Sequence, residues 1–172
     1  VRSILVDTGA SITIMRASCE PLLVDTRRST CEIVSANKGK SAARMEGVLN
    51  ILALNTCGNP DIPALTPMSF PVITMTGLNK ELLSMEQLAE QGWILQIHKD
   101  HGAGYGGMLF KEGQNGESDQ FCALRKASGD RFWWLDYVPA KRQTKEHVAL
   151  MGDTIERRQD RSLPKSTKEL EL

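Results

Sequence analysis

The chain has 172 residues, of which 41% are hydrophobic, and its 21 basic side chains balance its 21 acidic ones. This length suits one domain of ordinary size, or a small domain with an appendage. The zero net charge argues against a nucleic-acid-binding surface. No apolar run is long enough to span a membrane, and the N-terminus lacks the basic-then-apolar pattern of a leader. We therefore expect neither a transmembrane helix nor a signal peptide.

The cysteines and histidines argue against a metal site. The chain has three histidines and no Cys-x-x-Cys pair, and its four cysteines are widely spaced: Cys19, Cys31, Cys57 and Cys122. We therefore expect no bound metal and reduced thiols in an intracellular compartment, with a secreted protein carrying two disulfides as the alternative. His98 and His101 flank Asp100, but without a further ligand nearby this favours a solvated loop. Because the chain begins at Val1 rather than methionine, we expect an excerpt or a processing product.

The first predicted element is a strand over residues 3–6, which delivers Asp7 into a Thr-Gly turn. Gly9 permits a tight reversal that points backbone amides at the carboxylate, and the Thr8 hydroxyl can form a hydrogen bond locally or across an interface. An ordinary β-turn with an aspartate at its first position is the alternative for these three residues alone. The full string Asp-Thr-Gly-Ala-Ser at 7–11 is expected by chance in only about one chain in several thousand. It is the strongest functional signal in the chain.

The next segments read as short strands and turns. Residues 12–15 continue as a short strand or turn, and residues 19–24 form an irregular segment. A short strand over 31–34 leads into the small, polar, glycine-containing stretch 35–41, which predicts a hairpin tip that can move. A further strand is expected over 45–54.

The following region is predicted to hold a loop, a strand and the one confident helix. The proline-rich stretch 55–71 indicates a loop, and residues 71–75 predict a buried strand that ends at Thr76-Gly77. Gly92 then lies where a helix C-terminus favours glycine. Apolar residues recur near helical spacing before it, at Leu78, Leu82, Met85, Leu88 and Ala89.

From Trp93 onward the pattern is typical of a β-meander. Four short apolar-rich segments are separated by turns rich in Gly, Asn, Asp and Ser. The predicted strands cover 93–97, 108–111, 121–125 and 132–138. Beyond them, residues 139–172 are mostly charged and polar, which predicts a linker or tail.

Three features occur in an order that suggests a family. They are Leu-Val-Asp-Thr-Gly-Ala-Ser at 5–11, the hairpin at 35–41, and Pro-Val-Ile-Thr-Met-Thr-Gly followed by Leu-Leu-Ser within 71–84. Together they resemble the retropepsins, the aspartic proteases of retroviruses and LTR retrotransposons. Residues 77–93 are also similar to the Gly-Leu-x-x-Asn-Leu-Leu-Ser-x-x-Gln-Leu…Gly-aromatic stretch of copia-type polyproteins, whose protease is likewise followed by a β-rich segment. The resemblance covers roughly residues 4–138.

The resemblance implies a mainly β fold and a cytoplasmic protease. A retropepsin-like half-barrel with one short helix would span residues 1–92, a β-meander extension 93–138, and a flexible polar tail 139–172. The activity implied is aspartic endopeptidase cleavage of a retrotransposon polyprotein, inside cells and with virus-like particles as one setting. The implied partners are a second copy of the chain and a peptide or polyprotein substrate, without membrane or nucleic acid.

Site residues follow from the same resemblance. Asp7 would be the catalytic carboxylate, paired with Asp7 of a second copy across a two-fold axis. As in known aspartic dyads, the two carboxylates share one proton; one activates a water and the other hydrogen-bonds the scissile carbonyl, so no cofactor is needed. Gly77 would lie under the active-site loop in a structural role. The loop itself would be completed by Thr8, Gly9, Ala10 and Ser11, and the flap over the substrate would comprise Ala36, Asn37, Lys38, Gly39 and Lys40.

Two other interpretations stay open. The chain could be a catalytically inactive retroelement fragment that acts at most as a dimerisation or interaction module. It could also be the N-terminal lobe of a bilobal pepsin-like enzyme, which fits less well because a helix and a meander follow where a second Asp-Thr-Gly half would be expected. A Ser11 nucleophile is disfavoured because no histidine is near it in sequence.

Overall fold

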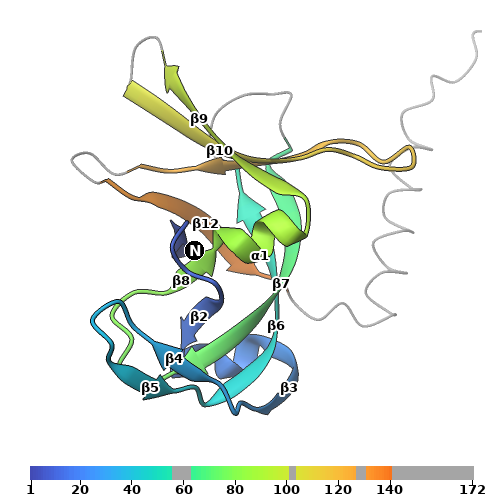
Figure 1. Ribbon diagram of the computed structural model, residues 1–172. Helices are drawn as coiled ribbons and strands as arrows, with labels where there is room; N and C mark the ends of the chain where they lie inside the picture. The colour runs from blue at the N-terminus through green and yellow to red at the C-terminus, as the bar shows by residue number, and fades with distance from the viewer. Residues whose placement is uncertain (56–62, 101–103, 127–130, 141–172) are drawn as a thin grey trace, which may run out of the picture. The chain divides into compact units, whose positions relative to one another are not determined.

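The computed structural model describes residues 1–55, 63–100, 104–126 and 131–140 (Figure 1). Residues Val1–Pro139 form one compact unit. The polar tail predicted over 139–172 lies, from residue 141 onward, outside the described residues.

The described chain is mainly β with two short helices, which confirms the predicted class at this level. The helices are a 3-10 helix, η1 (Ala17–Leu22), and an α-helix, α1 (Met85–Glu90). The strands are β1 (Arg2–Asp7), β2 (Thr13–Arg16), β3 (Leu23–Arg28), β4 (Glu32–Val34), β5 (Lys40–Ala42), β6 (Met45–Leu54), β7 (Leu65–Met75), β8 (Leu82–Ser84), β9 (Trp93–Asp100), β10 (Gly104–Lys111), β11 (Gln120–Leu124) and β12 (Trp133–Pro139).

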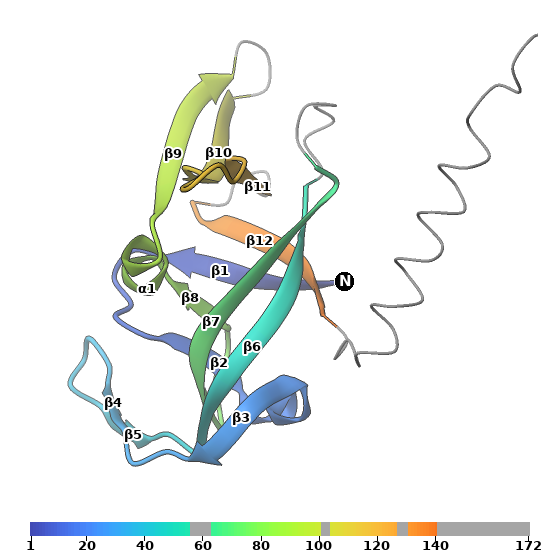
Figure 2. The ribbon, with the colours of Figure 1, turned by 90° about the vertical axis from the view of Figure 1, so that its right-hand side faces the viewer.

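Six strands close into a barrel in the order β12-β1-β8-β2-β7-β6 (Figure 2). Pairing between β12 and β6, as at Tyr137 and Ala53, completes the ring, and β3 extends the sheet beyond β6. The barrel is therefore closed rather than the predicted half-barrel. The difference arises because β12, expected in the meander, pairs with β1 and β6 instead.

Strand β8 lies between β1 and β2. It runs parallel to β1, with Ser84 opposite Asp7, and it meets β2 at Ile14 and Leu82. The turn that joins β1 to β2 therefore crosses the end of β8. This arrangement decides which residues lie beneath the Asp-Thr-Gly turn.

The predicted meander contains three strands rather than four. Strands β9, β10 and β11 form a separate antiparallel sheet, and an isolated bridge between Arg125, just after β11, and Trp134 of β12 joins it to the barrel. Side chains of the barrel hold β11 in place: the Asn55 side chain accepts a hydrogen bond from the Ala123 amide at 2.9 Å, and the Thr66 hydroxyl donates to the Phe121 carbonyl at 2.6 Å.

The predicted hairpin is confirmed. Strands β4 and β5 form an isolated two-stranded sheet with Val34 opposite Lys40. The Ser35 amide donates to the Gly39 carbonyl at 2.9 Å and closes the loop. Lys38 has φ +62°, a left-handed conformation that is uncommon for a residue with a side chain.

The helix is shorter than its apolar spacing predicts. Leu82 and Leu83 form part of β8, and α1 begins only at Met85. The reason is tertiary: Leu83 is fully buried in the barrel core, and the pairing of β8 with β1 on one side and β2 on the other overrides the helical periodicity. The predicted end is confirmed, since Gly92 has φ +90° and its amide donates to the Ala89 carbonyl at 2.9 Å.

The predicted loop over 55–71 is also shorter than expected. Residues 56–62 lie outside the described part, but β7 already begins at Leu65. Pro67 and Pro71 are exposed within this strand. They are tolerated because β2 pairs with β7 only over 72–75, so the missing amides of these prolines face no second strand.

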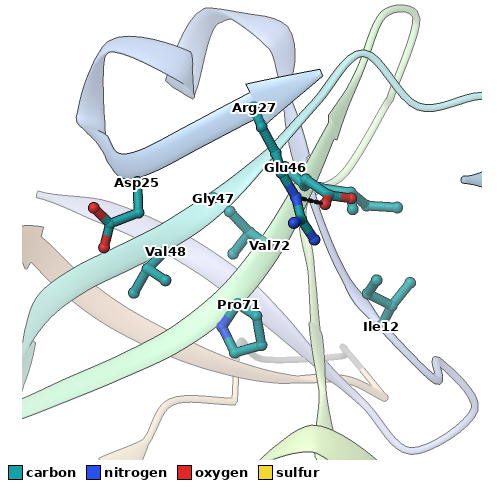
Figure 3. A pocket seen from close by; sticks show the side chains of 9 residues that line it. Ile12, Asp25, Arg27, Glu46, Gly47, Val48, Pro71 and Val72 are labelled. Carbon is teal, nitrogen blue, oxygen red and sulfur yellow. Dashed lines mark hydrogen bonds and ion pairs between the residues drawn. The ribbon is translucent and has the colours of Figure 1, made fainter. Parts of the chain in front are cut away.

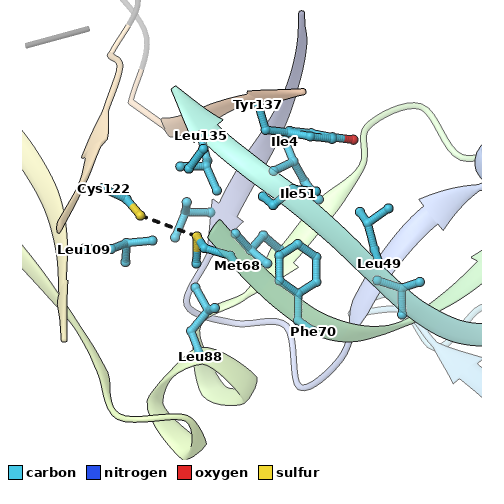
Figure 4. Packing of buried hydrophobic residues seen from close by; sticks show 14 of the residues in the cluster. Ile4, Leu49, Ile51, Met68, Phe70, Leu88, Leu109, Cys122, Leu135 and Tyr137 are labelled. Atoms are coloured by element: carbon cyan, nitrogen blue, oxygen red, sulfur yellow. Dashed lines mark hydrogen bonds between the residues drawn. The ribbon is translucent and has the colours of Figure 1, made fainter. Parts of the chain in front are cut away.

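One apolar core fills the barrel and continues under the three-stranded sheet (Figure 4). From Leu49 to Ala53 of β6 every second side chain is buried, which is the periodicity of a strand with one buried face. From the second sheet, Leu109 and Cys122 reach the same core, where the Cys122 sulfur lies 3.5 Å from that of Met68. The largest fully buried side chains include Ile4, Met15, Leu49, Ile51, Phe70, Leu135 and Tyr137.

Candidate active site

Asp7 stands at the point where the barrel core ends. The three residues before it are buried, Asp7 itself is half-buried, and Thr8 and Gly9 are exposed. The Gly9 amide donates a hydrogen bond to Asp7 Oδ1 at 2.8 Å, which is the contact expected of a tight turn at this glycine. A carboxylate is thus fixed by its own turn and remains within reach of solvent.

Ser84 braces this turn from beneath. Its hydroxyl donates to the Ala10 carbonyl at 2.6 Å, and its amide donates to the Thr13 hydroxyl at 3.0 Å. Both side chains are fully buried. The Ser84 hydroxyl also accepts from the Gln87 amide and caps α1, while the Gln87 side chain accepts from the Thr13 amide at 2.8 Å. Helix α1 and both sides of the turn therefore form one buried hydrogen-bonded unit.

The predicted role of Gly77 under the active-site loop stays a prediction. Gly77 is exposed, and a Cβ placed on it would meet no atom within 4 Å. Its φ of +73° shows that glycine is needed there for the turn between β7 and β8. Ser84 lies beneath the loop, and sequence reasoning missed it as a site residue. The Leu-Leu-Ser string was the only feature of the sequence that pointed to Ser84.

The residues predicted as a flap lie at the tip of the β4–β5 hairpin. Residues 36–40 are all exposed, and their bonds are mostly internal, including an ion pair between Glu32 and Lys40 at 3.0 Å. Figure 2 shows this hairpin and the β1–β2 turn projecting on the same side of the barrel.

An apolar cluster joins the base of the hairpin to the active-site turn. Its partly buried members include Ile12, which directly follows the Asp-Thr-Gly-Ala-Ser string, Ile33 of β4, and Leu78. They pack around buried Ile14 and Ile73 of the barrel wall. The fold therefore brings together two segments that are separate in sequence, with an apolar surface between them.

The half-buried carboxylate of Glu20 anchors the base of the hairpin. Glu20 accepts hydrogen bonds from Arg44 Nε at 3.0 Å and from the Thr74 hydroxyl at 2.8 Å. The Arg44 bond, followed by the Thr74 bond, holds the pKa of Glu20 below its ordinary value. The Arg44 amide also donates to the Thr74 carbonyl at 2.7 Å, so this segment is tied to β7 by side chain and backbone.

The described residues contain no group of three or more His, Cys, Asp or Glu side chains placed to hold a metal ion. His101, one of the histidines considered from the sequence, lies outside them. Cys19, Cys31 and Cys122 are free thiols, and burial raises the pKa of Cys122 to about 12. Within the described residues no helix combines the length and the apolar character needed to cross a bilayer.

A pocket of about 340 Å³ opens on the outward side of β6 and β7 (Figure 3). Asp7 is not among the residues that line it. Ile12 is the link between the two, because it lines the pocket and belongs to the cluster beside the turn.

Comparison with known proteins identifies no relative: no protein-family model, no curated protein and no solved structure matches the chain. Function has to be inferred from the site, since a fold alone does not define an activity.

Proposed function

We propose that the chain is a retropepsin-like aspartic endopeptidase that works as a homodimer in the cytoplasm, including virus-like particles, and cleaves a retrotransposon polyprotein. The observation that supports this most directly is the half-buried Asp7 on an exposed turn, held from beneath by buried Ser84. Such a carboxylate is held in place by its own turn and still reaches solvent, so it can react with a substrate, as a catalytic group must.

The dyad needs a second chain. The sequence holds one Asp-Thr-Gly string, so the partner carboxylate comes from Asp7 of another copy across a two-fold axis. Two carboxylates at that separation share one proton, because both cannot ionise side by side. The ionised one takes a proton from water, and the protonated one hydrogen-bonds the scissile carbonyl. Thr8, which is exposed, would contact the partner turn in such a dimer.

The surroundings of the turn suit an extended peptide. The β4–β5 hairpin offers exposed backbone for pairing with a substrate, and such pairing is independent of the peptide's sequence. The partly buried Ile12, Ile33 and Leu78 provide an apolar surface between the hairpin and the turn. Closure of the hairpin over a peptide would exclude water from the dyad.

The test of the mechanism is Asp7→Asn, with Glu112→Gln as the control. Loss of the ionisable group should lower the rate of peptide or self-cleavage by at least about a hundredfold. Glu112 is an exposed carboxylate outside the active-site turn, so Glu112→Gln should change neither the fold nor the rate. Full activity of Asp7→Asn would exclude the dyad, and loss of activity in Ser11→Ala alone would indicate a serine nucleophile instead.

Assembly is tested separately by light scattering at micromolar concentration. We expect a dimer, and excess Asp7→Asn chain should inhibit the wild-type protein by forming mixed dimers with only one carboxylate. A strict monomer without activity would favour the alternative, an inactive retroelement fragment that acts as an interaction module.

A further inference from the structure

The pocket on the outward side of β6 and β7 begins beside the active-site turn. Figure 3 shows Ile12 and Asp25 at opposite ends of it, with Val48 and Pro71 between them. Ile12 lies five residues after Asp7, so the near end of the pocket is within about 18 Å of the carboxylate. An extended peptide of five or six residues covers that span.

A local irregularity of the backbone presents Asp25 to this pocket. The pairing of β3 with β6 shifts between Val24 and Arg27, and Asp25 takes a left-handed conformation with φ +52°. Gly47 allows the close approach, because a Cβ there would lie 2.9 Å from the Val24 carbonyl oxygen. Bulges of this kind redirect a side chain, and they are frequent beside active sites.

The lining combines an apolar floor with one excess negative charge. Three charged side chains line the pocket, the carboxylates of Asp25 and Glu46 and the guanidinium of Arg27, which sum to −1. Arg27 and Glu46 form an ion pair with each other. The uncompensated charge is therefore that of Asp25, and the floor between it and Ile12 is aliphatic.

We infer that the pocket binds a lysine or arginine side chain of the polypeptide substrate. The aliphatic stem of such a residue would lie on the apolar floor, and its cation would face Asp25. An acidic side chain suits the pocket less well, because Arg27 is already paired and the net charge is negative. The inference rests on the proposed function, since it takes the pocket as part of the peptide path from the dyad.

The experiment measures peptide binding to the Asp7→Asn protein, in which binding does not depend on cleavage. The probes are apolar octapeptides that carry a single lysine at each position in turn, each compared with norleucine, which has a similar stem without the charge. At one position lysine should bind about two- to fivefold more tightly, the size expected of a solvent-accessible ion pair. Added salt should reduce this advantage.

Asp25→Asn should abolish the lysine preference without changing the affinity for norleucine, because asparagine tolerates the left-handed backbone. Glu112→Gln is the control: Glu112 is an exposed carboxylate outside the pocket, and its loss should leave the preference intact. Equal binding of lysine and norleucine at every position, no binding of any peptide, or a preference that survives Asp25→Asn would overturn the inference. If the wild-type protein binds with this preference but cleaves nothing, the proposed protease function is refuted and the inference about the pocket stands.

Discussion

The Asp-Thr-Gly turn and the β4–β5 hairpin project on the same side of the barrel but are held in different ways (Figure 2). Beneath the turn, Ser84 and Thr13 are fully buried and bonded to each other. At the hairpin tip, the bonds among Ser35, Asn37 and Gly39 lie in solvent. Loss of a buried hydrogen bond leaves its partner group without water and without a partner, which destabilises the fold. Water replaces the lost partner of an exposed hydrogen bond. The fold thus combines a turn braced by buried bonds with a hairpin tip whose bonds water can replace.

The largest effect should come from Ser84→Ala, which removes the bond to the Ala10 carbonyl and the cap of α1. Loss of a cap and of a buried hydrogen bond should lower the free energy of unfolding by about 2–3 kcal/mol. Urea denaturation measures it. Ser11→Ala, an exposed serine on the same turn, should change it by less than about 0.5 kcal/mol. Equal effects of the two variants would show that the turn is not braced from beneath.

An intermediate effect is expected where the hairpin joins the barrel. Glu20→Gln weakens the ion pair with Arg44 and should cost about 0.5–1 kcal/mol near neutral pH. Because the folded-state pKa of Glu20 lies below its ordinary value of 4.5, the carboxylate stabilises the fold above that value and loses its effect as the pH falls through the lowered pKa.

Wild type and Glu20→Gln should therefore differ in urea midpoint at neutral pH and converge in acid. Glu112→Gln, at an exposed site, should match the wild type at both extremes. A difference between wild type and Glu20→Gln that grows in acid would contradict the assigned direction.

The smallest effect should come from Asn37→Ala at the hairpin tip. Its side chain accepts bonds from the Ser35 hydroxyl and the Gly39 amide, all in exposed positions. The free energy of unfolding should change by less than about 0.5 kcal/mol, while amide exchange becomes faster at residues 35–41 only. A cost above about 1 kcal/mol would mean that the tip packs against the barrel.

Local signals in the sequence predicted the parts of this structure that depend on near neighbours. The strand before Asp7, the hairpin at 35–41 and the strand Met45–Leu54 all follow from alternation and turn residues within a few positions. The bond from the Gly9 amide to Asp7 also follows from the turn itself.

Features that depend on distant partners were not predictable in this way. Leu82 fits a helical period, and only the place of β8 between β1 and β2 makes it part of a strand. Leu135 and Tyr137 alternate as they would in a meander, so their pattern does not reveal that β12 completes the barrel. The role of Ser84 depends on this same long-range arrangement.

The closing position of β12 restricts where the chain could be cut without loss of its fold. Scission anywhere between α1 and Trp133 would release a product whose β1 and β6 edges lack their shared neighbour. Bare edges of this kind recruit strands from other molecules and promote aggregation. A cut on the C-terminal side that preserves this fold must therefore lie beyond Pro139, so that the last strand of the ring stays covalently attached to the segment that carries Asp7.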